Sequence, residues 1–433
     1  MKHWHPAKVL VLGYLFYSII GCLLLSLPFC HKQETTLLDD YFVAISAAST
    51  TGLAPIDIGS TYNLLGQIII VILIQLGGIG YMTFSSCVLL FTTGTLSHYR
   101  KKIGSHVLPF PKNFSVKEFI YSIISFTLIC EFIGAISLSI VFYMKGVDQF
   151  VWYGIFHGVS AFCTAGLSLF SDGFVSFQND VWLNLIICFL AIFGGLGFII
   201  ALDCYKNWTG QEKSFSFTSK VILAVTACFL IFGTFIYFFL EPNPNGSTHS
   251  IFQRAMIGFF QIMSASTTVG YNTVDIGMLK TPVLMVLIFC STFGSAPSGT
   301  GGGLKNTAFA TLLALVKNTV QDKPITLWNH EIHLKRIKIA TVAFIFYSFC
   351  IFLSMFLLSC SEKAGFLAIF FEAANALNNS GLSMGLTSNL TVVGKIFLSL
   401  LMLIGRAGVL TFGFAISSQR EDTVYAKKAE LIL

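Results

Sequence analysis

Charged residues are scarce in this sequence of 433 residues. Asp, Glu, Lys and Arg make up only 11% of it, whereas 55% of the residues are hydrophobic, including 44 Phe. Soluble domains carry roughly 25% charged residues, and so few polar side chains cannot cover a water-facing globule. The composition therefore excludes a soluble enzyme, a disordered protein and a nucleic-acid-binding protein, and it predicts a protein that crosses the membrane several times.

Zinc-protease and crosslinking motifs are also missing. His330-Glu331-Ile332-His333 lacks the H-E-x-x-H spacing of zinc proteases, so we interpret it as surface. The 11 cysteines form no C-x-x-C pair and lie mostly in apolar runs, which favours packing roles over disulfides. The first apolar run, 9–29, is too long for a signal-peptide core and lacks an A-x-A cleavage site. We expect no enzyme, no covalent cofactor and no nucleic-acid partner.

Long apolar segments are what the sequence has instead. A spanning helix needs about 20 mostly apolar residues. Between the two members of each pair of such segments lies a shorter, half-apolar stretch, which predicts a re-entrant segment. If the long connections share one side, that side holds 18 of the 26 Lys and Arg, so the positive-inside rule places both termini in the cytoplasm. The predicted spans are 8–29, 64–93, 116–144, 181–202, 218–240, 282–316, 337–360 and 391–417.

An internal repeat is the strongest pattern. Each half-apolar stretch ends in a tetrad whose third residue is glycine; these glycines are 114, 104 and 111 residues apart, and an alanine stands five residues before each. A second glycine-containing element follows, beginning at Gly77, Gly194, Gly294 and Gly405. Two features in one register predict four copies of helix, re-entrant loop and helix, over 1–93, 94–208, 209–318 and 319–433. The tetrads are Thr50-Thr51-Gly52-Leu53, Thr164-Ala165-Gly166-Leu167, Thr268-Val269-Gly270-Tyr271 and Asn379-Ser380-Gly381-Leu382.

Four re-entrant loops in one chain predict an all-α polytopic membrane protein whose repeats surround a central pore with fourfold pseudosymmetry. A short helix ending before each tetrad would turn the negative end of its dipole to the axis, which favours a cation. Extended tetrads would supply backbone carbonyls that replace the hydration shell of a monovalent cation, and glycine allows the required backbone angles. Helix-capping glycines are the alternative for one loop, but four in one register argue against it. We expect all sixteen tetrad residues to form the ion-binding filter.

The stretch from Gly294 to Lys305 interrupts the sixth span. Its glycines and Pro297 cannot continue a helix, and irregular backbone at membrane depth must be buried in protein or line water. A passive kink is one interpretation. The other, which we favour, is a flexible constriction below the third tetrad. It would be formed by Gly294, Gly299, Gly301, Gly302 and Gly303.

Arg406 lies in the middle of the eighth span, in the position that Gly78, Gly195 and Ser295 occupy in the other repeats. Intramembrane charges are costly and usually functional. An arginine paired with a buried acid such as Glu131 is one interpretation. We favour a positive barrier under the filter that slows leak. For Glu131 itself, a proton relay is possible, but a satisfied hydrogen-bonding group between helices is the better expectation.

Taken together, these features resemble the Trk/Ktr/HKT superfamily of potassium transporters, and within it the KtrB-type, TrkH-like membrane subunit. The resemblance covers essentially the whole chain. The sequence departs from the pattern at Cys163 and at Asn378-Asn379-Ser380. The most specific pieces are Thr50 to Leu53, Gln75 to Phe84, Gly294 to Lys305, and Gly405 to Thr411.

The resemblance implies potassium uptake across a bacterial inner membrane, with the tetrad glycines selecting the ion and with 294–303 and Arg406 as the gate. It also implies a homodimer docked on a cytosolic, nucleotide-binding regulatory subunit of the KtrA/TrkA type. Related systems respond to sodium, so sodium-stimulated uptake is one expectation. A sodium-selective or weakly selective cation transporter of the same fold is the alternative.

Overall fold

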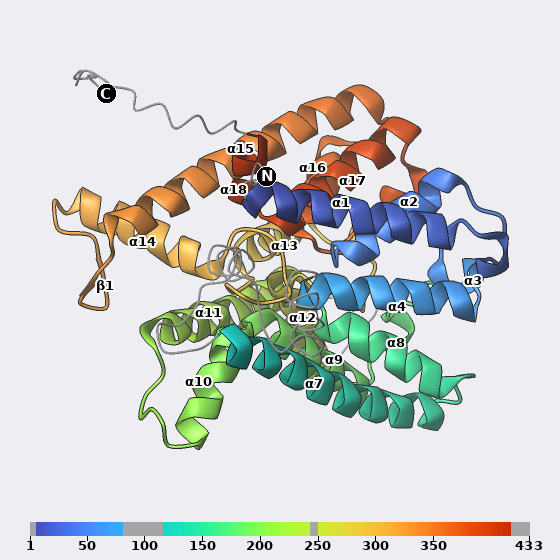
Figure 1. The fold of residues 1–433 in the computed structure, drawn as a ribbon, viewed down its shortest axis with the longest axis horizontal. Coiled ribbons are helices and arrows are strands. Elements are labelled where there is room, and N and C mark those ends of the chain that lie inside the picture. Colours follow the sequence, from blue (N-terminus) through green and yellow to red (C-terminus); the bar gives the residue numbers. More distant parts are fainter. Residues whose placement is uncertain (1–5, 81–115, 243–249, 417–433) are drawn as a thin grey trace.

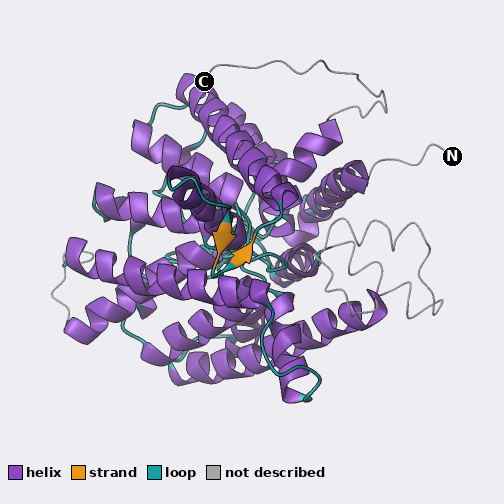
Figure 2. Ribbon diagram, turned by 90° about the vertical axis from the view of Figure 1, so that its left-hand side faces the viewer, coloured by secondary structure: helices purple, strands orange, loops and turns teal. Residues whose placement is uncertain are grey.

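The computed structural model describes residues 6–80, 116–242 and 250–416. This part of the chain is almost wholly helical and contains one short β-hairpin (Figures 1 and 2), as the all-α prediction requires. Three predictions lie outside the described residues: the end of the span 64–93, the boundary between 93 and 94, and the tail after 416.

Four long helices lie mostly exposed on the outside of the molecule. Each is long and apolar enough to cross a membrane. Large apolar side chains on these helices are exposed: Phe132 is 68% exposed and Phe352 is 73% exposed. Bare surface of this kind suits contact with lipid rather than water. The four helices are α1 (Pro6–Leu25), α7 (Val116–Met144), α11 (Phe217–Leu240) and α15 (Leu334–Ser361).

A short helix follows each long one. The longest has 17 residues, about 26 Å at 1.5 Å per residue, which is less than the roughly 30 Å of a hydrocarbon core. Local sequence fixes where they begin: the Thr36 side chain accepts a hydrogen bond from the Asp39 N–H, and Ser250 and Gln253 form a capping box. These are the predicted re-entrant helices. They are α2 (Leu37–Ala48), α8 (Phe150–Phe162), α12 (Ile251–Thr267) and α16 (Phe366–Asn378).

A third set of helices runs back from the other side of each tetrad. Asn63, Asp180 and Thr391 cap three of them with side-chain hydrogen bonds. The set is α4 (Leu64–Ile79), α9 (Val181–Leu196), α13 (Thr281–Phe293) and α17 (Val392–Ala407). The last three resume after a break as α10 (Phe198–Trp208), α14 (Asn306–Val320) and α18 (Val409–Ile416).

The predicted spans 181–202 and 391–417 are each divided by a break that the sequence analysis did not predict. The helices α9 and α10 meet at 93°, with Gly197 between them at φ +86°, and Gly408 at φ +84° separates α17 from α18. Residues with a Cβ rarely adopt this left-handed region, which ends a helix regardless of hydropathy. In the sixth span the break falls where it was predicted, between Phe293 and Asn306.

The remaining elements are small. One turn of helix, α3 (Ile58–Thr61), follows the first tetrad. Strands β1 (Thr326–Leu327) and β2 (His330–Glu331) form an antiparallel hairpin between α14 and α15. His330 and Glu331 are exposed there, which confirms the surface interpretation of that motif.

The four helical units pack in a closed ring. Each short helix contacts the long helix of its own unit: α1 with α2, α7 with α8, α11 with α12, and α15 with α16. Each also contacts the third-set helix of the preceding unit: α4 with α8, α9 with α12, α13 with α16, and α17 with α2. The last pair joins the end of the chain to its beginning (Figure 1). This order is the one expected of four units around an axis; the pseudosymmetry itself stays a prediction.

Candidate functional site

The four tetrad glycines lie against one another at the centre of the ring of units. A methyl group built on Gly52 would lie 3.0 Å from the Cα of Gly381 and 3.2 Å from the carbonyl carbon of Gly166. One built on Gly166 would lie 3.4 Å from the carbonyl carbon of Gly270, and one on Gly270 would collide with the backbone of Gly381. The contacts therefore close a circle. No position in it has room for a Cβ without a shift.

Backbone carbonyls gather in this circle without partners. Among the described residues, none donates a hydrogen bond to the carbonyl oxygens of the first three residues of any tetrad. Thr51, Ala165, Val269 and Ser380, at the middle of that stretch, are all 0% exposed. Buried carbonyls are almost always paired with a protein group, water or a ligand. Twelve carbonyl oxygens along the tetrads therefore have no donor among the described residues.

The tetrads stop being equivalent at their fourth residue. The carbonyl oxygens of Leu167 and Tyr271 accept hydrogen bonds from the hydroxyls of Ser160 and Ser264, at 2.9 and 2.5 Å. The Tyr271 hydroxyl also donates to the Leu167 carbonyl, at 3.0 Å. No described residue donates to the carbonyls of Leu53 or Leu382. At this level only two of the four carbonyls are left unpaired by protein donors.

The alanine that stands five residues before each glycine lies in the last turn of its short helix. The N–H of the first tetrad residue donates to that alanine's carbonyl at 3.1 to 3.2 Å in all four units. The first tetrad residue is also left-handed in all four, with φ between +50° and +61°. This is a left-handed helix cap, and it directs the negative helix end at the tetrad. The pairs are Thr50 with Ala47, Thr164 with Ala161, Thr268 with Ala265, and Asn379 with Ala376.

The second glycine elements support the same helix ends. A methyl group on the first glycine of each element would collide with the carbonyl oxygen four residues before the tetrad glycine of the same unit. The third-set helices therefore pack directly against the ends of the short helices, which only glycine permits. The contacts are Gly77 on Ala48, Gly194 on Phe162, Gly294 on Ser266, and Gly405 on Leu377.

The loop between α13 and α14 lies against the first residues of the tetrads. Thr164 donates its hydroxyl hydrogen to the Thr300 hydroxyl at 2.9 Å, and the Gly302 N–H donates to the Thr268 hydroxyl at 3.1 Å. Within the loop, the Lys305 ammonium donates to the Gly301 carbonyl at 2.7 Å. The loop thus occupies the end of the tetrad ring at which the short helices stop.

The five glycines predicted for this loop all lie at close approaches. A methyl group on any of them would come within 3 Å of backbone or side-chain atoms, and Gly303 is left-handed at φ +69°. Their neighbours are Ser266 for Gly294, Gly195 for Gly299, Thr268 for Gly301, Asn378 for Gly302 and Ser291 for Gly303.

Arg406 bridges three units at this end of the ring. Its guanidinium donates to the Thr50 hydroxyl at 2.7 Å and to the carbonyl oxygens of Thr300 and Gly77. The described residues include no ion pair between Arg406 and an acid. The interpretation of Arg406 as the partner of Glu131 is therefore wrong, because the arginine is used to hold the glycine-rich loop and the first tetrad together.

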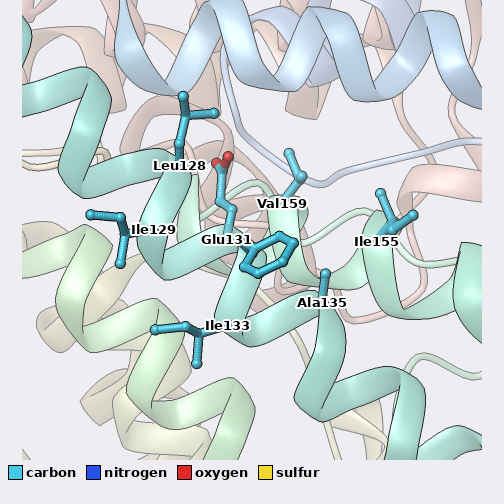
Figure 3. A pocket seen from close by; sticks show the side chains of 8 residues that line it. Leu128, Ile129, Glu131, Ile133, Ala135, Ile155 and Val159 are labelled. Atoms are coloured by element: carbon cyan, nitrogen blue, oxygen red, sulfur yellow. The ribbon is translucent and has the colours of Figure 1, made fainter.

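Glu131 has neutral partners instead. Its carboxyl group accepts a hydrogen bond from the Gln75 amide at 2.9 Å and one from the Cys163 thiol at 3.5 Å. Glu131 borders an open groove of about 700 Å³ on α7 and α8, and Figure 3 shows its carboxyl group among apolar side chains such as Leu128 and Val159. The expectation of a hydrogen-bonded group between helices is confirmed.

Sequence reasoning missed Thr300, which touches two of the functional elements. Its hydroxyl contacts Thr164, and its carbonyl accepts from Arg406. The signal was present, because Thr300 is the one β-branched hydroxyl residue inside the glycine-rich stretch. A single hydroxyl side chain within a run of glycines indicates a residue that forms a specific hydrogen bond.

Comparison with known proteins identifies the family. A family model described as a cation transport protein, TrkH, matches residues 15–423. The chain belongs to the TrkH family. It is 32% identical to the Ktr system potassium uptake protein B of Vibrio alginolyticus, over 96% of this chain and 94% of that protein. It is 30% identical to the potassium/sodium uptake protein NtpJ of Enterococcus hirae, over 100% of this chain and 98% of that protein.

The fold agrees with that membership. The crystal structure of the potassium transporter TrkH from Vibrio parahaemolyticus matches with a TM-score of 0.75 and 20% identity, over 96% of this chain and 86% of that one. The family resemblance and the all-α membrane fold are thus confirmed. Membership in a family of cation transport proteins points to transport rather than catalysis.

Proposed function

We propose that this TrkH-family protein takes up potassium through the ring of four tetrads. The observation that carries the proposal is the closed circle of glycines with twelve unpaired backbone carbonyls around it. Carbonyl rings replace the hydration shell of a monovalent cation, and four helix ends directed at the ring add favourable negative potential. Potassium uptake is also the activity in the names of the relatives from Vibrio alginolyticus and Bacillus subtilis.

The membrane potential supplies the driving force. Each charge that moves inward gains about 2.3 kcal/mol per 100 mV, which suffices for passive influx. Sodium stimulates the flux in this proposal. No covalent cofactor takes part.

The glycine-rich loop and Arg406 form the gate. The loop lies against the first residues of the second and third tetrads, and Arg406 joins it to the first. An ion that leaves the ring on this side must displace backbone that is held by hydrogen bonds. The gate therefore opens when the contacts of Arg406, Thr300 and Gly302 are broken together.

A sodium-selective or weakly selective transporter is the second candidate. In the fourth tetrad the first residue is Asn379 rather than threonine, and its amide donates to the Thr51 hydroxyl at 3.0 Å and the Met402 carbonyl at 2.8 Å. The first residues of the four tetrads are thus not chemically equivalent. The relative NtpJ is named for both ions.

The proposal also covers the membrane, the orientation and the partners of the chain. We place it in a bacterial inner membrane with both termini in the cytoplasm, as a homodimer docked on a cytosolic, nucleotide-binding subunit of the KtrA/TrkA type. The two potassium uptake relatives are named as parts of a Ktr system, which supports an assembly of several components.

Uptake by cells that lack their own potassium systems tests the proposal. Gly381→Ser is the variant of choice, because Gly381 is not left-handed and its added Cβ approaches other atoms no closer than 3.0 Å. We expect the unaltered chain with its partner to restore growth at low potassium. The variant should lose about tenfold in preference for potassium over sodium, which corresponds to about 1.4 kcal/mol.

Gly365→Ser is the matched control, because a methyl group there meets nothing within 4 Å and serine is a good residue for the start of α16. It should leave the preference unchanged. An unaltered preference in Gly381→Ser would contradict the assignment of the tetrads. No potassium uptake by the unaltered chain, with sodium uptake intact, would favour the second candidate.

A further inference from the structure

A second register of buried residues runs along the short helices. Nine residues before each tetrad glycine stands a side chain that is 0% exposed, and in three of the four units it is polar. Burial of a polar side chain is unfavourable unless its hydrogen bonds are made. These residues are Val43, His157, Gln261 and Glu372.

Glu372 on α16 holds the chain just beyond the fourth tetrad. Its carboxyl oxygens accept hydrogen bonds from the Ser383 hydroxyl at 2.5 Å, the Met384 N–H at 3.1 Å and the Thr387 hydroxyl at 2.8 Å. No ion pair of Glu372 occurs among the described residues. Both carboxyl oxygens are thus tied to the chain beyond the tetrad. Ser383 and Met384 are the second and third residues after the tetrad glycine.

His157 on α8 makes the corresponding contacts in the second unit. Its Nε2 accepts from the Leu169 N–H at 3.3 Å and lies 3.2 Å from the Ser168 hydroxyl. Because Nε2 accepts, the ring proton is on Nδ1, which donates to the Tyr153 carbonyl at 2.8 Å. Ser168 and Leu169 are again the second and third residues after the tetrad glycine. His157 is thus tied to the chain beyond the second tetrad.

Gln261 on α12 does the same in the third unit, where its amide donates to the Thr273 hydroxyl at 2.9 Å. Thr273 is the third residue after the tetrad glycine. The first unit has no such contact: Val43 is apolar, the residues beyond its tetrad are Ala54 and Pro55, and proline has no N–H to donate.

We propose that His157, Gln261 and Glu372 are positioning residues that fix the outer ends of three tetrads and thereby set ion discrimination. The proposal rests on the function proposed above and deepens it. A carbonyl ring discriminates between ions through the placement of its oxygens. The first tetrad residues are held from the helix ends and the gate loop, whereas the chain beyond the glycine is held by this register.

The test compares polar and apolar replacements at Glu372 in purified protein reconstituted in liposomes. Half-saturating concentrations of potassium and sodium are measured separately from the maximal rates. Glu372→Leu should raise the half-saturating potassium concentration and reduce the preference between the two ions by about tenfold or more, because the hydrogen bonds that hold the loop are lost. The maximal rate should change much less.

Glu372→Gln should restore most of the preference, because glutamine serves at the equivalent position in the third unit. His157→Leu and His157→Gln form a second pair in case Glu372→Leu does not fold. Val43→Ala is the control: it removes packing at the same register from the unit that lacks the hydrogen bond. It should leave the preference unchanged even if it lowers the unfolding temperature.

Two results would overturn the proposal. One is an unaltered preference in both leucine variants. The other is an equal loss of preference in Val43→Ala, which would indicate general loosening. The unaltered protein tests the proposed function separately: if it transports sodium rather than potassium, that function fails, and the variants still report whether preference for sodium depends on this register. If it transports neither ion, cation-dependent shifts of the unfolding temperature replace uptake as the measure of preference.

Discussion

At the scale of single residues, small residues allow the close packing of the tetrads, and one charged residue, Arg406, forms hydrogen bonds between units. The tetrad glycines allow the backbone of neighbouring tetrads to approach closely. The carbonyl of the alanine five residues earlier accepts a hydrogen bond from the N–H of the first tetrad residue. Arg406 is the one charged side chain that contacts a tetrad residue among the described hydrogen bonds. Its contacts with Thr50, Thr300 and Gly77 hold the glycine-rich loop without an acidic partner among the described residues.

Replacing Arg406 should therefore open the gate. Arg406→Ala loses charge-assisted hydrogen bonds that are worth about 1.5 to 3 kcal/mol each, so we expect uptake to rise about tenfold or more. Arg406→Lys keeps the charge but not the forked geometry, so its uptake should lie between that of the unaltered protein and that of Arg406→Ala. Rubidium uptake by cells measures the flux. Arg254→Ala, which removes an arginine in the first turn of α12 that donates to the Phe238 carbonyl on α11, serves as control. An unaltered flux in Arg406→Ala would contradict its role in the gate.

At the scale of elements, the breaks in the third-set helices matter more than their lengths. Hydropathy continues through Gly197 and Gly408, so a composition-based prediction runs the helices on. The left-handed glycines end both helices, and at Gly197 the loop between α13 and α14 also occupies the space: a methyl group on Gly197 would lie 2.7 Å from the Gly299 nitrogen and the Pro297 carbonyl oxygen.

Gly197→Ala should therefore disturb both stability and gating. The left-handed conformation costs an alanine about 1 to 2 kcal/mol, and displacement of the loop adds to this. Gly210→Ala is a close match, because Gly210 has φ +72° and nothing within 4 Å of an added methyl group. Thermal unfolding should show the conformational penalty in both variants, whereas altered uptake should appear only in Gly197→Ala. Equal uptake in the two variants would show that the contact with the gate loop is unimportant.

At the scale of the whole molecule, the ring depends on contacts between the last unit and the first. Lys395 on α17 forms an ion pair with Asp39 at the start of α2, with 2.6 Å between Nζ and Oδ1. Burial alone would raise the pKa of Asp39, but the hydrogen bonds from Lys395 and Thr36 outweigh it and hold the pKa below its ordinary value. Asn379 and Thr51 join the same two units at the tetrads.

Breaking the ion pair should destabilise the ring in a pH-dependent way. Because the pKa of Asp39 is lowered by folding, the pair contributes stability above about pH 4, and the contribution disappears as the pH falls through the folded-state pKa. Asp39→Asn should lower the free energy of unfolding by about 2 kcal/mol at neutral pH, with the difference fading in acid. Lys145→Met, which removes a pair whose lysine is 48% exposed, should cost less. A difference for Asp39→Asn that is independent of pH would contradict this linkage.

Sequence reasoning located the tetrads, the alanines and the glycine-rich break in the sixth span because each repeats or interrupts a pattern along the chain. It could not predict that Arg406 contacts Thr50 and Thr300, since those partners come from other units and only the closed ring brings them together. It also left the register of His157 and Glu372 unnoticed, because the position holds four different residue types, and the three polar ones share only the contact that they make. Repetition is visible in a sequence; partners across units are not.

The central claim is that the tetrad carbonyls bind the transported cation. The most direct measurement is anomalous diffraction from crystals of the protein in rubidium, with potassium and sodium as competitors. We predict density inside the circle of Gly52, Gly166, Gly270 and Gly381 that potassium displaces more readily than sodium does, and that Gly381→Ser weakens. Rubidium bound elsewhere along the chain, with that circle empty, would contradict the account.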